Sequence, residues 1–196
     1  MNAPTFTVIA GINGAGKTSL YRVISADTPL GERINTDEIA FSLGSVNDPL
    51  TQIKASRIAI KKIGEYIASK TSFHIETTLP GQTVEKYVRR AKENGFRIVL
   101  YFVGIDDVSV AINRVHRRIA NGGHGIADSY ILKRYGTLND NLRMILPYCD
   151  DAYLFDNTLK FRQVAYFTEN KLADCDSSLP LWFIELMDTQ NANDSI

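Results

Sequence analysis

One eight-residue segment constrains the fold of this chain more than any other. Residues 11–18 read Gly-Ile-Asn-Gly-Ala-Gly-Lys-Thr, which fits the pattern G-x-x-x-x-G-K-[ST]. A β-branched run at residues 5–10 precedes the segment, and Leu20, Val23 and Ile24 follow it at helical spacing. This order of strand, glycine loop and helix is the context in which such a loop binds phosphate groups.

The residue types in this segment indicate how phosphate would be held. Glycines let the backbone amides turn inward around the anion, and the next helix directs its positive end to the same place. We expect Lys17 to reach the β- and γ-phosphates of ATP, and Thr18 to offer its hydroxyl to Mg²⁺. The other predicted nucleotide contacts in the loop are Gly11, Asn13, Gly14, Ala15, Gly16 and Ser19.

The rest of the chain alternates short apolar runs with helical patterns. Strands are predicted at residues 33–35, 72–76, 97–103, 152–155 and 164–168, and helices at residues 18–25, 49–70, 82–94, 106–120 and 128–145. Such alternation predicts an α/β fold of the P-loop type, a three-layer sandwich with a mainly parallel sheet and ligands at the carboxyl ends of its strands. We expect one domain over residues 1–188, with a helical lid at about 111–145 and a flexible tail at 189–196.

Composition excludes some classes of function. The 196 residues carry 22 basic and 22 acidic side chains, so the positive excess that nucleic-acid binding draws on is missing, and a nucleic-acid partner is not expected.

Cys149 and Cys175 lack the spacing of a metal site and are expected to be buried thiols. No targeting signal or long apolar run is found, so we expect a cytoplasmic protein without a membrane partner.

Two acidic positions are candidates for the chemistry. Asp106 follows the strand at 97–103, where an ATPase usually carries a magnesium-binding acid, but it also opens a helix and is expected to cap it. Asp37 follows the strand at 33–35 and would lie at the carboxyl edge of the sheet, beside the phosphate loop. It can act as general base for an alcohol, or it can cap a short helix through residues 39–43.

A third group of polar side chains ends the strand at residues 72–76. Glu76, Thr77 and Thr78 can bind a polar ligand there, or they can form a solvated strand end. His74 lies within the strand and is expected to pack in the core.

Basic residues gather on two predicted helices. Arg114, Arg117 and Arg118 share one helix face, and Lys133 and Arg134 follow on the next helix, beyond a glycine-rich break. A mobile lid of this kind can bring an arginine to a transferring phosphoryl group, although a solvated helix face has the same pattern.

Taken in order, these segments resemble the zeta-toxin-like P-loop kinases, in particular a compact branch of predicted ATPases. The resemblance spans about residues 5 to 157. Its segments are residues 9–18, Asn-Thr-Asp-Glu-Ile-Ala at 35–40, Glu-Thr-Thr-Leu at 76–79, Arg114 with Arg118, Gly-Gly-His at 122–124, Arg-Tyr at 134–135 and Asp-Asn at 156–157. The chain has Ala127 and Thr137 where lids of this family often carry proline and arginine.

The resemblance implies a kinase that phosphorylates a hydroxyl group. It implies that Asp37 is the catalytic base, that Arg118 and Arg134 act with Lys17 on the phosphates, and that Asn157 contacts the nucleotide. The implied acceptor site consists of Asp37, Glu76, Thr77, Thr78 and Arg114.

Well-known members of this family phosphorylate UDP-N-acetylglucosamine and are toxins held in check by an antitoxin. A nucleotide sugar is therefore the leading acceptor, and an antitoxin is a possible protein partner. The alternatives are a nucleotide-dependent ATPase or binding module that acts through a protein partner, and a nucleoside or polynucleotide kinase.

Overall fold

The computed structural model describes residues 3–44, 48–123 and 125–193. Its strands form one sheet in the order β2-β3-β1-β4-β5-β6-β7. Strands β1 to β5 are parallel, and β6 and β7 are added antiparallel at one edge. The strand bounds are Thr5–Ala10 (β1), Glu32–Ile34 (β2), Phe73–Thr77 (β3), Arg97–Gly104 (β4), Asp151–Asp156 (β5), Arg162–Thr168 (β6) and Lys171–Cys175 (β7).

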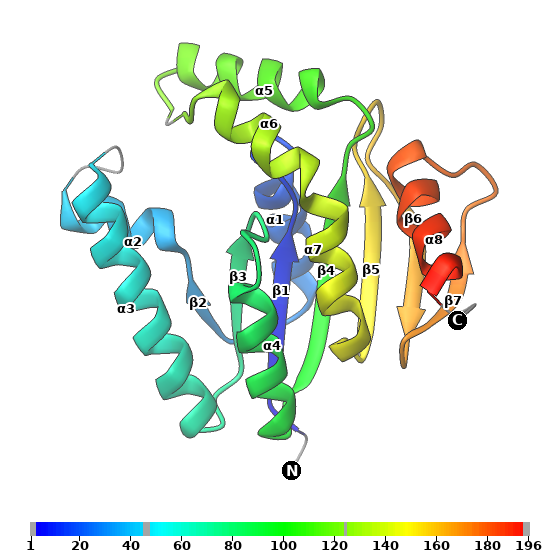
Figure 1. Ribbon diagram of the computed structural model, residues 1–196. Helices are drawn as coiled ribbons and strands as arrows, with labels where there is room; N and C mark the ends of the chain where they lie inside the picture. The colour runs from blue at the N-terminus through cyan, green and yellow to red at the C-terminus, as the bar shows by residue number, and fades with distance from the viewer. Residues whose placement is uncertain (1–2, 45–47, 124, 194–196) are drawn as a thin grey trace.

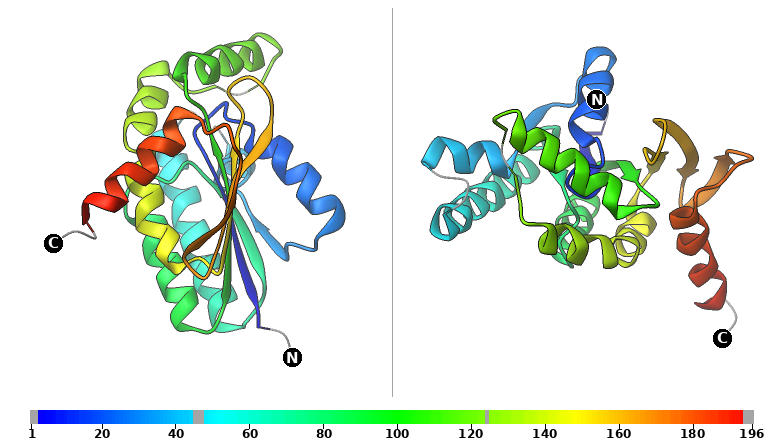
Figure 2. Two further views of the ribbon diagram at one scale, coloured as in Figure 1. Left: turned by 90° about the vertical axis from the view of Figure 1, so that its right-hand side faces the viewer. Right: turned by 90° about the horizontal axis from the view of Figure 1, so that it is seen from above.

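Helices cover both faces of the sheet, so the predicted three-layer α/β sandwich is confirmed (Figure 1). Helix α1 lies on one face, and α3, α4, α7 and α8 lie on the other; α5 and α6 cross above the carboxyl ends of the central strands (Figure 2). The helix bounds are Lys17–Asp27 (α1), Thr36–Leu43 (α2), Pro49–Ala68 (α3), Thr83–Glu93 (α4), Val108–Ala120 (α5), Asp128–Gly136 (α6), Leu138–Ile145 (α7), Leu146–Tyr148 (η1, a 3₁₀ turn) and Leu181–Asn193 (α8).

The core lies around the two central strands. Residues 6–10 of β1 are all buried, as are most residues of β4, because parallel strands covered on both faces expose almost no side chains. Phe6 stacks on Phe73 of β3 with ring centroids 4.3 Å apart, and Phe96 meets Phe73 edge-on at 5.9 Å. This burial explains why β1 and β4 read as continuous apolar runs in the sequence.

The lid differs from its prediction in one respect. A single helix over residues 128–145 was expected, whereas the chain leaves the helical conformation at Thr137 and forms α6 and α7 as separate helices. Gly136 and Thr137, the two residues at the break, are both weak helix formers. The break lets α6 lie above the strand ends while α7 packs against the sheet (Figure 1).

The C-terminal quarter contains two elements that the sequence patterns do not predict. All five residues of β7 are exposed, so this edge strand lacks an alternating apolar face. Helix α8 is held by buried apolar residues near its start, including Trp182, Phe183 and Leu186. The predicted flexible tail at 189–196 overlaps the end of α8, which extends to Asn193; residues 194–196 lie outside the described ranges.

The two cysteines have different environments. Cys149 is buried as expected, and its pKa is raised to about 12 by burial. The expectation for Cys175 is wrong: this thiol is exposed, because it ends the solvent-facing edge strand β7.

Helix α3 is the longest of the described helices at 20 residues, and it carries lysine and arginine side chains. Within the described ranges, no helix is both long and apolar enough to span a membrane.

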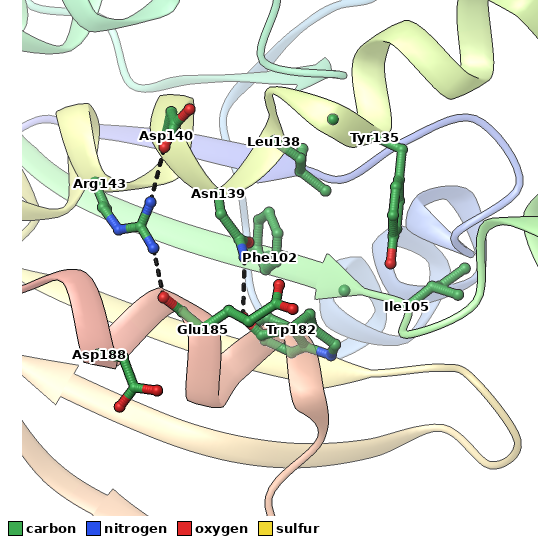
Figure 3. A pocket seen from close by; sticks show the side chains of 12 residues that line it. Phe102, Ile105, Tyr135, Leu138, Asn139, Asp140, Arg143, Trp182, Glu185 and Asp188 are labelled. Atoms are coloured by element: carbon green, nitrogen blue, oxygen red, sulfur yellow. Dashed lines mark hydrogen bonds and ion pairs between the residues drawn. The ribbon is translucent and has the colours of Figure 1, made fainter.

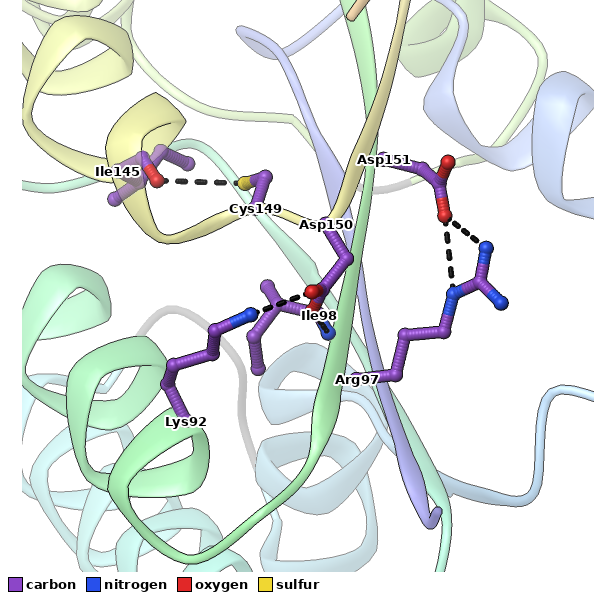
Figure 4. Close-up of polar contacts among 7 residues, drawn as sticks. All are labelled: Lys92, Arg97, Ile98, Ile145, Cys149, Asp150 and Asp151. Atoms are coloured by element: carbon purple, nitrogen blue, oxygen red, sulfur yellow. Dashed lines mark hydrogen bonds and ion pairs between the residues drawn. The ribbon is translucent and has the colours of Figure 1, made fainter. Parts of the chain in front are cut away.

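Two neighbouring aspartates fasten the amino-terminal end of β5 (Figure 4). Asp150 accepts a hydrogen bond from the amide of Ile98 at 2.8 Å and pairs with Lys92 of α4. Asp151 accepts from Arg97 of β4 at 3.0 Å (Nε) and from the Tyr166 hydroxyl of β6 at 2.6 Å. Burial would raise the pKa of Asp151, but the hydrogen bonds from Tyr166 and Arg97 outweigh it, so the pKa lies below its usual value.

We predict that Asp151→Asn lowers the free energy of unfolding at pH 7 by about 2 kcal/mol, since it weakens hydrogen bonds to a charged group. A carboxyl whose pKa is lowered by folding stabilises the protein above its unfolded pKa of about 3.9, and this contribution is lost as the pH falls through the lower folded pKa. The difference between variant and wild type should therefore shrink in acid. Urea unfolding at pH 7 and pH 3 measures it, with the exposed Asp174→Asn as control; an equal difference at both pH values would contradict a charge effect.

Candidate active site

The candidate site lies where the carboxyl ends of β1, β3 and β4 meet. The phosphate loop follows β1, and its context of strand before and helix after is as predicted. The amide of Gly11 donates to the carbonyl of Thr77 at 3.3 Å, so the loop starts beside the end of β3. Parallel register places Ala10 between Thr77 and Phe102, which brings residues from three distant parts of the sequence to one edge.

Two glycines of the loop are required by close packing. Gly11 has a φ of +143°, and a Cβ there would lie 2.5 Å from the carbonyl oxygen of Val103 in β4. Gly14 has a φ of +81°, and its Cβ would lie 2.3 Å from the carbonyl oxygen of Ala111 in α5. Both positions combine a left-handed conformation with a backbone contact, so no other residue type fits without displacing β4 or α5.

Lys17 is held over the loop that precedes it. Its Nζ donates to the carbonyls of Gly11 at 2.8 Å and Ile12 at 3.0 Å. The pKa of Lys17 is lowered to about 8: burial is the largest cause, Arg134 and Arg118 act in the same direction, and Glu76 and Asp37 act in the opposite direction. All four of these predicted residues therefore come near enough to Lys17 to influence its charge.

Thr18 and Glu76 form the polar wall next to Lys17. The Thr18 hydroxyl lies 3.3 Å from Glu76 Oε2, and Arg33 of β2 pairs with Glu76 Oε1 at 2.7 Å. A hydroxyl beside a carboxylate is an oxygen donor set of the kind that Mg²⁺ takes, with phosphate and water completing the shell. No cluster of three or more His, Cys, Asp or Glu side chains suited to a metal occurs in the described part of the chain. Thr18 and Glu76 thus fit a magnesium ion carried by a nucleotide better than a metal bound by the protein alone.

Asp37 lies in the first turn of α2, with its carboxylate exposed. The cap of this helix is Asn35, whose side chain accepts from the amides of Asp37 at 3.0 Å and Glu38 at 3.3 Å. The interpretation of Asp37 as the helix cap is therefore wrong, and its carboxylate is not used in capping α2. Its negative charge raises the pKa of both Lys17 and Arg134, opposing the effect of their burial.

The lid contacts the phosphate loop through two arginines. Arg134 of α6 donates to the side-chain oxygen of Asn13 at 2.5 Å, and burial lowers its pKa. Arg114 of α5 donates to the carbonyl of Gly14 at 3.4 Å, so it lies against the phosphate loop. Arg118 is exposed near the end of α5. His116 and Asp128 join α5 to α6 at 2.8 Å, and His124, between these helices, lies outside the described residues.

The two aspartates that follow β4, Asp106 and Asp107, accept hydrogen bonds from backbone amides of α5 and α8. Helix α5 is capped by Asp107, whose side chain accepts from the amide of Ser109 at 2.8 Å, so the expectation that Asp106 is the cap is wrong by one residue. Asp106 instead accepts from the amide of Trp182 at the start of α8 at 2.9 Å, and its carbonyl accepts from the hydroxyl of Tyr135. Asp106 therefore ties the lid and α8 to the end of β4.

The remaining predicted residues lie around the same edge. Asn157, after β5, donates to the carbonyl of Ala15 at 2.7 Å and thereby supports the loop. The Thr77 hydroxyl accepts from the amide of Leu79 at 3.1 Å, while Thr78 is half-buried and Ser19 exposed. His74 is buried, as expected; it stacks on Tyr21 at 5.2 Å, and burial lowers its pKa.

A separate cavity of about 460 Å³ lies between α7, α8 and the end of β4 (Figure 3). Trp182, Tyr135 and Phe102 give it an aromatic lining, and Arg143 bonds Asp140 and the carbonyl of Glu185 at its rim. None of the predicted site residues lines the cavity.

The sequence patterns do not single out Arg33 of β2, which pairs with Glu76 at the site. A lone arginine in a three-residue edge strand belongs to no motif or period that would mark it.

Comparison with known proteins identifies the family. The family model described as zeta toxin matches residues 1–147, three quarters of the chain. The chain belongs to the zeta toxin family. This member is 35% identical over 125 residues to an uncharacterized protein of Haemophilus influenzae. The aligned part makes up 64% of this chain and 88% of that protein.

Solved structures share the fold of this zeta toxin family member at low sequence identity. A chain of the PezAT chromosomal toxin–antitoxin system of Streptococcus pneumoniae has a TM-score of 0.63 and 17% identity, over 99% of this chain and 88% of that one. A chain of the AvrRxo1-ORF1:-ORF2 complex with ATP has a TM-score of 0.66 and 15% identity. The match covers 95% of this chain and 63% of that one. For several matched structures the chain spans only 46% to 63% of the other chain. Family and fold together support an ATP-binding phosphotransferase.

We predict that this zeta toxin family member binds ATP more weakly as the pH rises above about 8. Phosphate favours the charged form of Lys17, whose pKa of about 8 means that the free protein loses this proton near that pH. The dissociation constant should then rise by up to about tenfold per pH unit. Titration of a fluorescent ATP analogue from pH 7 to 9.5 measures it, and calorimetry at pH 8.5 in two buffers should show proton uptake. A flat profile would contradict the lowered pKa.

Proposed function

We propose that this protein is a kinase that transfers the γ-phosphate of ATP to a hydroxyl of a small molecule, with Asp37 as general base. The observation that carries the proposal is the common location of Lys17, Asp37 and Arg134. Their charges act on one another across the phosphate loop, although they come from three different elements. An exposed carboxylate near enough to two cations to raise their pKa values suits deprotonation of an alcohol better than binding of the phosphates themselves.

Each group has a separate task in the proposed reaction. Lys17 holds the β- and γ-phosphates, and Thr18 contributes to the shell of Mg²⁺, which neutralises charge between those phosphates. Asp37 takes the proton of the acceptor hydroxyl while the hydroxyl oxygen attacks the γ-phosphorus. The bond between the γ-phosphorus and the bridging oxygen breaks, and ADP leaves. Arg134, which already contacts the loop through Asn13, and Arg118 stabilise the charge that builds up on the transferred group.

The acceptor is proposed from the family. A nucleotide sugar such as UDP-N-acetylglucosamine is the leading candidate, bound near Glu76, Thr77 and Thr78 at the end of β3. The similarity to a chain of a toxin–antitoxin system supports a further proposal, that this protein is toxic and has an antitoxin partner.

Another class of function is a nucleotide-dependent switch, in which ATP orders the lid and a protein partner responds. The direct contact of Arg134 with Asn13 favours this candidate as well, since it couples the lid to the loop. A polynucleotide kinase is less favoured, because equal numbers of basic and acidic residues provide no general attraction for nucleic acid.

We predict that Asp37→Asn lowers the rate of phosphate transfer by about 10² to 10⁴-fold, the usual contribution of a general base, and changes ATP affinity less than twofold. The assay combines labelled ATP with a panel of nucleotide sugars, nucleosides and other metabolites. Lys17→Ala is the blank, and Asp27→Asn at the far end of α1 is the matched control, expected to retain full activity. Unchanged turnover in Asp37→Asn would remove its role as base, and ATP binding without transfer to any acceptor would favour the switch.

Toxicity has its own test. Wild type and Lys17→Ala are expressed side by side in bacteria, and growth is followed after induction. We expect the wild type alone to arrest growth, and equal growth of both cultures would exclude a toxin that depends on ATP.

A further inference from the structure

Arg33 of β2 joins two carboxylates beside the phosphate loop. One terminal nitrogen pairs with Glu76 at 2.7 Å and the other with Glu38 at 2.7 Å. Its guanidinium also lies over the ring of Tyr21, 4.6 Å from the centroid. Three contacts from three elements, α1, α2 and β3, thus fix the orientation of one side chain.

The contact with Glu76 determines which way that carboxylate faces. Glu76 Oε1 is taken by Arg33 and Oε2 lies 3.3 Å from the Thr18 hydroxyl, so both oxygens are engaged. The side chain of Glu76 is only 8% exposed. The carboxylate therefore faces Thr18, in the first turn of α1 and next to the phosphate loop.

Two features of Arg33 are not explained by stability alone. Its Nε is buried and has no hydrogen-bond partner among the described residues, which disfavours the folded state. Its ion pair with Glu38 is largely exposed, since 59% of the Glu38 side chain is accessible, and exposed pairs stabilise little. What Arg33 does achieve is a fixed geometry for Glu76.

We propose that Arg33 is a positioning residue, which holds Glu76 beside the Thr18 hydroxyl so that the carboxylate serves the magnesium ion of bound ATP. The inference rests on the proposed function for the presence of ATP and magnesium, and it adds a residue and a task that the family resemblance does not supply. It also moves Glu76 from the acceptor side of the site to the metal side. Groups that orient a metal-binding carboxylate typically change metal affinity by about 10 to 100-fold when removed.

The test measures how nucleotide binding depends on magnesium. A fluorescent ATP analogue is titrated at a series of Mg²⁺ concentrations, without any acceptor. For Arg33→Met we expect the Mg²⁺ concentration at half-maximal binding to rise at least about tenfold, and binding in the presence of EDTA to stay unchanged. Arg33→Lys keeps a cation within reach of Glu76 and should recover part of the effect. Glu38→Gln is the matched control: it removes the other partner of Arg33 and should behave like the wild type.

A double mutant separates positioning from a general effect on the fold. If Arg33 acts through Glu76, adding Arg33→Met to Glu76→Gln should change the magnesium dependence no further. Additive effects of the two substitutions would overturn the proposal. Thermal unfolding of each variant checks that it folds, and if Arg33→Met does not, the comparison of Arg33→Lys with Glu38→Gln still decides.

Failure of this inference and failure of the proposed function give different results. A wild type that binds no ATP at any Mg²⁺ concentration contradicts the proposed function itself. A wild type with magnesium-dependent binding and an Arg33→Met variant with the same dependence overturns the role of Arg33 alone. A variant that changes only the KM of the acceptor also overturns it, since Glu76 would then serve the acceptor.

Discussion

The parallel pairing of β1 with β3 and β4 is the constraint on which the site depends. It places the ends of the three strands side by side, so the loop after β1 lies between Thr77 and Val103. The loop packs so closely there that Gly11 meets the backbone of β4 and Gly14 meets α5. The two glycines therefore serve different contacts: Gly11 lets the loop pass close to β4, and Gly14 lets it pass close to α5 of the lid, so a side chain at either position would disturb one of them.

Charge is the second organising factor of the site. The charges of two arginines and two carboxylates act on Lys17, and burial outweighs any one of these charges in setting its pKa. The arginines of the lid lower the pKa of Lys17 and the carboxylates of β3 and α2 raise it, so these charges partly offset one another at the loop. Because Arg134 reaches the loop from α6, movement of the lid would alter the electrostatics of the loop as well as its access.

Much of the fold follows from local patterns, and this explains which predictions are confirmed. The apolar runs of β1 and β4 reflect the burial of these strands directly. The edge strand β7 is missed because pairing with β6 forms it, and helix α8 is missed because packing of Trp182 on Phe102 of β4 helps to hold it; neither contact leaves a local period. The break between α6 and α7 is missed although it coincides with two weak helix formers, Gly136 and Thr137. The cap of α5 is displaced by one residue, from Asp106 to Asp107, because Asp106 is used by a helix 76 residues further along the chain.

The sequence by itself determined the phosphate loop, its strand and helix, the α/β class and the family, since all of these rest on residues that are neighbours in the chain. It also identified Asp37, Glu76, Arg118 and Arg134 as candidates. Only the tertiary structure decided how they meet: Arg134 contacts Asn13 across 121 positions, Asn157 contacts Ala15 across 142, and Arg33 turns Glu76 toward Thr18. Contacts between residues so far apart depend on strand register and helix packing, which no local pattern encodes.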